Sequence, residues 1–151
     1  MVTHWQWQGF LQLSGADLYT VLTARQQVFL LEQKCLYPDM DGLDQDAHHL
    51  LGWRTIDDRS QLAAYLRCLT PGTKYAEMSL GRVLTTAGNR GMGIGRELLV
   101  RGIEHAERQH PGHRIRIGAQ LYLERFYVEL GFQRVSDPYD DDGIQHIDML
   151  R

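Results

Sequence analysis

Apolar and polar residues alternate at the start of the chain and then change to a longer period. In HWQWQGF, residues 4–10, tryptophans alternate with polar residues, which predicts a first strand. From residue 14 the apolar positions lie three or four residues apart, which predicts an amphipathic helix over residues 14–32 that buries the stem of Arg25. Ser14 followed by Asp17 is typical of a helix start. The acidic, turn-rich segment KCLYPDMDGLDQDA predicts a loop.

The rest of the chain predicts short strands separated by two helices. HHLLGWRT, LAAYLRCL and MSLGRVLTT predict three strands, the first two joined by the turn DDRSQ. A helix is predicted from about Ile94 to Gln109, then a short strand, RIRIGAQ, and a helix, LYLERFYVEL, closed by Gly131. FQRVSDPY and GIQHIDML predict two last strands around the turn DDDG. The order β-α-β-β-β-α-β-α-β-β contains a central β-α-β unit, which we expect to be parallel and right-handed.

Length and composition narrow the class of protein. A chain of 151 residues with 43% apolar and 23% charged residues predicts one soluble globular domain, residues 1–151. The net charge of −3 disfavours nucleic-acid partners, and no apolar window is long enough to predict a membrane span. Cys35 and Cys68 form no CxxC pair, which favours reduced thiols in a cytoplasmic protein. The histidines lack an H-x-x-x-H spacing, so no metal site is expected.

The segment TTAGNRGMGIGRELL, residues 85–99, places three glycines at alternate positions directly before a predicted helix. Glycine lets a ligand approach the main chain closely. The segment lacks the Gly-Lys-Ser/Thr of a Walker loop, and its G-x-G-x-G spacing differs from the G-x-G-x-x-G of a dinucleotide fold. A strand, a loop with exposed amides and a helix N-terminus remain, and this combination predicts an anion site.

Two segments of the chain resemble the GNAT superfamily of N-acyltransferases. Arg90–Gly95 matches the family's pyrophosphate loop, Q/R-x-x-G-x-G/A, and ERFYVELGF is similar to its late helix and strand, with Tyr127 at the usual tyrosine. RQQVFLLEQKCLYPDMDGLDQDAHHLLGW and DDDGIQHIDM resemble the ElaA-like subgroup. The resemblance implies an α/β (α+β) fold with a central mixed, mostly antiparallel sheet of about seven strands flanked by helices. It also implies acetyl-CoA as co-substrate, without a metal.

The resemblance also implies the residues of the site. Amides of residues 91–96 would hold the pyrophosphate, the free strand edge at residues 83–85 would pair with pantetheine, and Gln120 stands where the family often has asparagine. Tyr127 would protonate the departing thiolate, and Glu32 and His146 are candidates for the base that accepts the amine's proton. The residues expected to hold the cofactor are Val83, Leu84, Thr85, Arg90, Gly91, Met92, Gly93, Ile94, Gly95, Arg96 and Gln120.

Several alternatives stay open on the sequence alone. Tyr127 is also compatible with a core aromatic, Glu32 with a local salt bridge, His146 with an ordinary strand residue, and a water could relay the proton. DMDGLD lacks the ligand pattern of an EF-hand, so we expect a solvated or substrate-facing loop whose aspartates could steer an amine.

The acceptor is expected to be a primary amine on a small molecule or peptide, and a homodimer is compatible with this fold. Two other function classes remain. One is an acyl-homoserine-lactone-synthase-like enzyme, because the spacing of Arg25, Phe29, Asp41 and Asp44 is similar to the start of those synthases. The other is a non-catalytic acyl-CoA-binding regulatory module.

Overall fold

Residues 1–151 are all described by the computed structural model, which contains eight strands and three α-helices. The strands form two four-stranded sheets. The strands are β1 (His4–Gly9), β2 (His48–Ile56), β3 (Arg59–Leu69), β4 (Ser79–Thr85), β5 (Arg116–Gln120), β6 (Gln133–Arg134), β7 (Tyr139–Asp141) and β8 (Ile144–Leu150). The helices are α1 (Gly15–Arg25), α2 (Ile94–Gln109) and α3 (Glu124–Glu129). None of them is long and apolar enough to cross a membrane.

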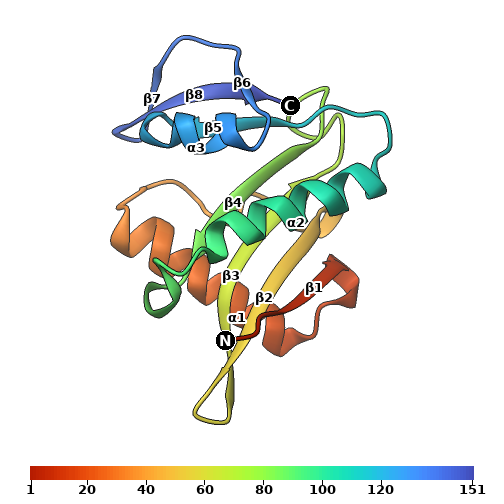
Figure 1. Ribbon diagram of the computed structural model, residues 1–151, viewed down its shortest axis with the longest axis vertical. Coiled ribbons are helices and arrows are strands. Elements are labelled where there is room, and N and C mark those ends of the chain that lie inside the picture. Colours follow the sequence, from red (N-terminus) through yellow and green to blue (C-terminus); the bar gives the residue numbers. More distant parts are fainter.

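The first sheet is antiparallel in the order β1-β2-β3-β4 and buries both faces. Successive side chains of a strand point to opposite faces, so Leu66 packs with α2 on one face while Tyr65 packs with α1 on the other. Figure 1 shows α2 crossing the front of this sheet. The second sheet adds β5, β8 and α3 to the α2 side of the core through residues such as Ile117 and Ile147.

The second sheet has the order β5-β8-β6, with β7 paired to β8, and lies with α3 at one end of the molecule (Figure 1, blue). One parallel bridge, Met78 to Ile115, joins it to the first sheet. The Met78 amide donates to Arg114 O at 3.2 Å, and the Arg116 amide donates to Met78 O at 2.9 Å. Beyond this bridge β4 and β5 do not pair, so the predicted single sheet of about seven strands is in fact two sheets that separate along β4.

A β-bulge interrupts β4 next to the separation. Tyr65 pairs with Leu84 and Arg67 with Gly81, so β4 holds one more residue than β3 over this stretch. Arg82 lies in the bulge with φ of +51°, a left-handed conformation that non-glycine residues rarely adopt. The bulge bends β4, and its free edge then faces the space between the sheets.

Two predicted elements are each divided in the structure. The predicted helix over residues 14–32 is α-helical only to Arg25 and continues as a π-helical segment, Gln26–Glu32. The predicted strand FQRVSDPY forms β6 and β7 instead, separated by residues 135–138. Pro138 within this interval has no backbone N–H to donate to a ladder.

Candidate active site

A cavity of about 620 Å³ follows the free edge of β4 between the two sheets. Its walls come from β4, β5, α3, the π-helical segment, the loop after that segment, and the β7–β8 hairpin. The sequence-predicted residues that line it are Glu32, Val83, Leu84, Thr85, Arg90, Gly95, Gln120, Tyr127 and His146. The fold therefore brings the predicted catalytic residues together from segments far apart in the sequence.

The glycine loop lies at one end of this cavity, where α2 begins. Gly91 and Gly93 have φ of +76° and +75°, and no side chain caps the first turn of α2. A Cβ built on either glycine would meet nothing within 4 Å, so packing within the protein does not explain why these positions lack a side chain. Ile94 is buried and anchors the loop to the core, while Met92 is exposed. The uncapped amides thus face open space, which suits an anion.

Arg90 lies over the end of β4. Its Nε and Nη2 donate to the carbonyl of Thr85 at 3.1 and 3.0 Å, and its Nη2 also donates to Glu32 at 2.7 Å. The Thr85 carbonyl therefore points away from β3, and Val83, two residues earlier, shares that orientation. Glu32 makes the salt bridge that the sequence left open.

Arg96 is not part of the cavity wall. Its guanidinium pairs with Glu129 and lies 5.3 Å from the centre of the Phe126 ring. Of the predicted cofactor residues after Arg90, the cavity wall includes Gly95 and Gln120 but not residues 91–94, which lie between Arg90 and Gly95 in the loop.

Tyr127 is held in a small aromatic cluster at the base of α3. The centres of the Phe126 and Phe132 rings lie 5.4 and 5.7 Å from that of Tyr127, both edge-on. The side chain is 8% exposed but lines the cavity, and its hydroxyl makes no hydrogen bond within the protein. Burial raises the pKa of Tyr127 to about 12, so the hydroxyl carries its proton at neutral pH.

His146 and Gln120 are opposite each other on β8 and β5. The Nδ1 atom of His146 lies 2.8 Å from the carbonyl O of Ile144. A carbonyl only accepts, so Nδ1 donates to it, and Nε2 makes no hydrogen bond within the protein. The Tyr139 ring stacks on His146 at 6.1 Å. Gln120 makes only a long contact, 3.4 Å, to Gln33.

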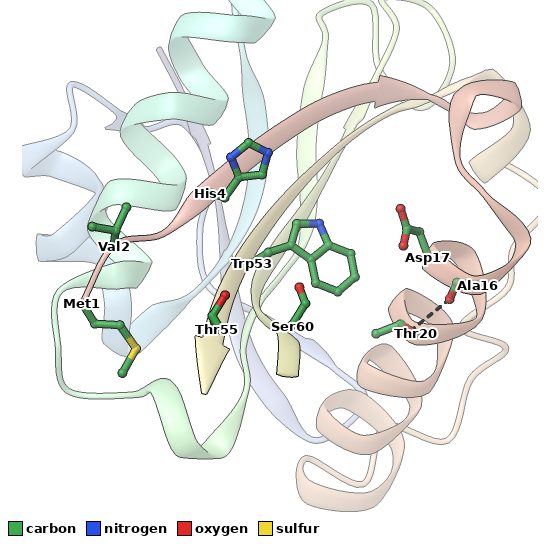
Figure 2. A pocket seen from close by; sticks show the side chains of 9 residues that line it. All are labelled: Met1, Val2, His4, Ala16, Asp17, Thr20, Trp53, Thr55 and Ser60. Carbon is green, nitrogen blue, oxygen red and sulfur yellow. Dashed lines mark hydrogen bonds between the residues drawn. The ribbon is translucent and has the colours of Figure 1, made fainter. Parts of the chain in front are cut away.

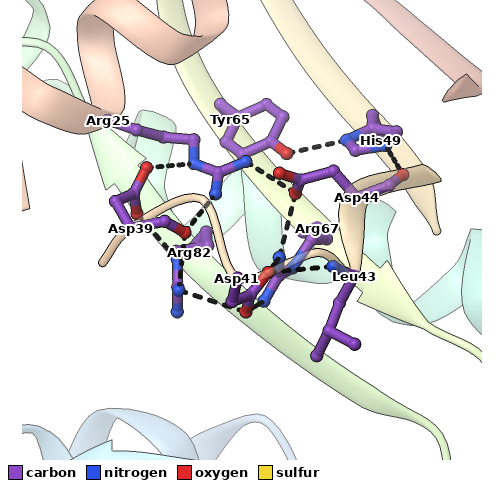
Figure 3. A network of polar contacts seen from close by, with 9 residues as sticks. All are labelled: Arg25, Asp39, Asp41, Leu43, Asp44, His49, Tyr65, Arg67 and Arg82. Carbon is purple, nitrogen blue, oxygen red and sulfur yellow. Dashed lines mark hydrogen bonds and ion pairs between the residues drawn. The ribbon is translucent and has the colours of Figure 1, made fainter. Parts of the chain in front are cut away.

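A buried ion-pair network stands behind one wall of the cavity (Figure 3). Arg25 donates to Asp39 at 2.8 Å and to Asp44 at 2.7 Å. Arg67 donates to Asp41 at 2.8 Å and to Asp44 at 2.9 Å. Two further contacts join Arg82 to the network: its Nε lies 2.8 Å from Asp39 Oδ1, and its Nη2 lies 3.3 Å from Asp41 Oδ2.

The network corrects the prediction for the acidic loop. Asp39, Asp41 and Asp44 are not free to attract an amine, because three arginines neutralise them, and Asp44 is only 7% exposed. Arg67 and Arg82 also line the cavity, and the sequence analysis missed both. The spacing of Arg25, Asp41 and Asp44 was visible in the sequence, but the pairing of the aspartates with arginines on β3 and β4 depends on which strands lie side by side.

The network predicts a loss of stability in acid. Burial alone would raise the pKa of Asp44, but the hydrogen bonds and positive charges of Arg25 and Arg67 together outweigh it and lower this pKa. A carboxylate whose pKa is lower in the folded state stabilises the fold above its unfolded pKa, about 3.9, and this stabilisation is lost as the pH falls below that value. In melting curves measured from pH 6 to 2, Asp44→Asn should therefore flatten the acid limb relative to wild type. Asp46→Asn, at an exposed aspartate without an ion pair, is the control. The same fall in melting temperature with acid in both variants would contradict the prediction.

A second hollow, of about 780 Å³, lies between α1 and the edge of the first sheet (Figure 2). It is larger than the β4 cavity, but it contains none of the predicted site residues and no helix N-terminus with uncapped glycine amides. Its lining residues are Met1, Val2, His4, Ala16, Asp17, Thr20, Trp53, Thr55 and Ser60. Size alone therefore does not identify the active site, and the chemistry points to the β4 cavity.

Comparisons with known proteins agree with this arrangement. Residues 28–151 match the family described as an acetyltransferase (GNAT) domain. The chain is 48% identical to the UPF0039 protein sll0451 of Synechocystis over 99% of this chain and 96% of that protein. An acyl-CoA N-acyltransferase structure from Pseudomonas aeruginosa superposes with a TM-score of 0.92 at 38% identity, covering 99% of both chains. Escherichia coli ElaA superposes with a TM-score of 0.91 at 36% identity, also over 99% of both chains. The chain therefore belongs to the GNAT acetyltransferase family and has its fold, with ElaA and the UPF0039 proteins as homologues.

Proposed function

We propose that this protein transfers an acetyl group from acetyl-CoA to a primary amine. The observation that carries the proposal is the single cavity that begins at the uncapped amides of α2, follows the free edge of β4, and contains both Tyr127 and His146. The reaction needs each of these features. An extended thioester entering the cavity from the α2 end would meet them in that order.

The donor would bind mainly through the main chain. Amides of residues 91–96 would receive the pyrophosphate at the positive end of α2. The pantetheine arm would then pair with Val83 and Thr85, whose backbone groups face away from β3. Arg90 already bonds to the Thr85 carbonyl, and its guanidinium would give up that bond as the arm enters while it stays paired with Glu32. Arg96 would reach them only by leaving Glu129.

The amine would attack the thioester carbonyl directly, without a covalent enzyme intermediate. As the C–N bond forms, the amine nitrogen loses a proton and the carbonyl oxygen becomes an oxyanion, which a main-chain donor at the bulge of β4 would stabilise. As the C–S bond breaks, the sulfur leaves as a thiolate. Tyr127 would protonate it, because this hydroxyl is protonated at neutral pH and points to no other partner.

His146 is the better placed of the two candidate bases. Its Nε2 makes no hydrogen bond within the protein, whereas the carboxylate of Glu32 is bound to Arg90. We therefore assign proton acceptance to His146. Glu32 would hold Arg90 at the end of β4 instead.

Ligand-dependent melting and thiol release together test the function. Acetyl-CoA and CoA should raise the melting temperature, as any ligand of the folded state does, whereas NAD and ATP should not. Release of free CoA should then require both acetyl-CoA and an amine. Release from an acyl-carrier protein in place of acetyl-CoA would favour the homoserine-lactone-synthase alternative. CoA binding without turnover of any amine would favour the regulatory module.

A further inference from the structure

We propose that the acceptor is a small, freely diffusing amine on a slender stem, and that a backbone roof over the cavity excludes lysines on folded proteins. The inference rests on the proposed function for its reaction and on the geometry of the cavity for its acceptor class. The roof is the contact between the loop of residues 33–37 and the tip of the β7–β8 hairpin, residues 140–143.

The roof closes through one hydrogen bond between distant segments. The amide of Leu36 donates to Asp142 Oδ2 at 2.5 Å, across 106 residues of sequence. The neighbours of both residues line the cavity: Cys35 and Tyr37 on one side, and Asp141 on the other. Because residues on both sides of this bond line the cavity, the bond joins two of its walls, and we infer that the joined segments close the cavity on that side.

The roof covers the half of the cavity that is left for the acceptor. The donor would occupy the half that runs from the glycine loop to Tyr127. The remaining lining includes Tyr37, Tyr75 and Tyr139, and Tyr139 is the register partner of His146, the proposed base. An acceptor nitrogen must reach His146 beneath the hairpin, so its stem has to pass between aromatic walls.

Charge in this half of the cavity does not oppose an ammonium group. Arg67 and Arg82 line it, but aspartates of the buried network neutralise both. Lys74 also lines the cavity, with its ammonium 5.3 Å from the centre of the Tyr75 ring. Asp141 makes no ion pair, and the hairpin tip carries two more aspartates beside it. These three carboxylates outnumber the Lys74 ammonium, so the charge on this side of the cavity favours a small cationic amine. The cavity volume also lies in the range of roughly 300–1,000 Å³ that is typical of small-molecule sites.

A lysine on a folded protein does not fit this geometry. Its ammonium stands on a four-carbon stem attached to a backbone that neighbouring residues surround. To bring the nitrogen to His146, that backbone would have to enter between the roof and the tyrosine walls. Such a clash disfavours lysines on folded proteins without any specific contact between the enzyme and the preferred small amine.

Cys35 reports on the roof without any acceptor, because it belongs to the loop of residues 33–37, lines the cavity and is only 7% exposed. Asp142→Ala removes the acceptor of the Leu36 amide and should raise the rate of Cys35 alkylation by iodoacetamide at least about tenfold, because an opened segment exposes its groups to reagents. Asp142→Asn keeps an oxygen acceptor and removes the negative charge that helps to raise the Cys35 pKa, so it measures the effect of that charge alone and should stay well below the rate of Asp142→Ala. Cys68, fully buried in β3 with a pKa raised to about 12 by burial, is the internal standard for global unfolding. Equal rates of Cys35 alkylation in wild type and Asp142→Ala would contradict the proposed roof.

The acceptor class is tested by rates of acetyl transfer to linear alkylamines and diamines, and to a folded protein with exposed lysines at equal amine concentration. In wild type, the rate of transfer to the best small amine should exceed the rate per amine on the folded protein. Asp142→Ala should reduce the ratio of these two rates by about tenfold or more, because the clash with the roof is lost. Equal wild-type rates per amine on the folded protein would overturn the inference while leaving the proposed function intact. Absence of transfer to every amine, together with absence of CoA binding, would overturn the proposed function, and the alkylation result would still decide the roof.

Discussion

Replacing Gly93 with valine is expected to abolish CoA binding while leaving the fold intact. Gly93 caps α2 with φ of +75°, and a β-branched side chain there is strained by roughly 1–2 kcal/mol. The added methyl groups would stand in the open space in front of the α2 amides. Because those amides are the proposed pyrophosphate site, we expect the dissociation constant measured by calorimetry to rise at least about 100-fold, or about 2.7 kcal/mol.

Gly88→Val is the matched control for this prediction. Gly88 lies in a short 3-10 turn just before the loop, its φ is not positive, and a Cβ there also meets nothing within 4 Å. The same side chain is thus added a few residues away without backbone strain. Near wild-type CoA affinity in Gly93→Val, with a normal melting curve, would rule out main-chain binding at this loop.

Tyr127→Phe should lower kcat by about 10–100-fold and leave acetyl-CoA affinity nearly unchanged. General acids usually raise the rate 10²–10⁴-fold. A thiolate already leaves fairly easily, so we expect an effect at or below the lower end of that range. The hydroxyl would act only as charge develops on sulfur, and an interaction made only in the transition state changes turnover rather than binding. The phenyl ring keeps the edge-on contacts with Phe126 and Phe132, so packing should survive.

Tyr19→Phe, on the exposed face of α1, removes a hydroxyl at a distance from the cavity and should have no effect on kcat. The comparison needs an acceptor for which chemistry limits the rate, shown by a single-turnover rate equal to kcat. If Tyr127→Phe then turns over like wild type from pH 6 to 9, Tyr127 is a core aromatic and another group protonates the thiolate.

Elements with strong local signals were predicted well from the sequence. The bounds of α2 agree with the periodicity of its apolar residues, and Ser14 caps α1 by accepting from the amide of Asp17. Gly131 has φ of +91°, as its predicted place after α3 requires. These features depend on residues within a few positions of each other, which is the range that periodicity and capping describe.

Features that depend on distant segments were not predicted. From its sequence alone the acidic loop is predicted to be solvated, because its partners, Arg67 and Arg82, lie on strands more than twenty residues away. The separation of β4 from β5 follows from a bulge and a single bridge, neither of which has a sequence signal. The roof likewise joins Leu36 to Asp142 across most of the chain. The glycine loop could be predicted as a candidate anion site because its signal is local, whereas the acceptor half of the cavity has no local signal.

Amide chemical-shift mapping by two-dimensional NMR during a titration with CoA tests the central claim most directly, because it reports on each backbone N–H separately. The account predicts that the largest shifts fall on the amides of residues 91–96, with Val83 and Thr85 next, and that Trp53 in the second hollow stays unchanged. Largest shifts around Trp53, Thr55 and Ser60, or no shifts at saturating CoA, would contradict it.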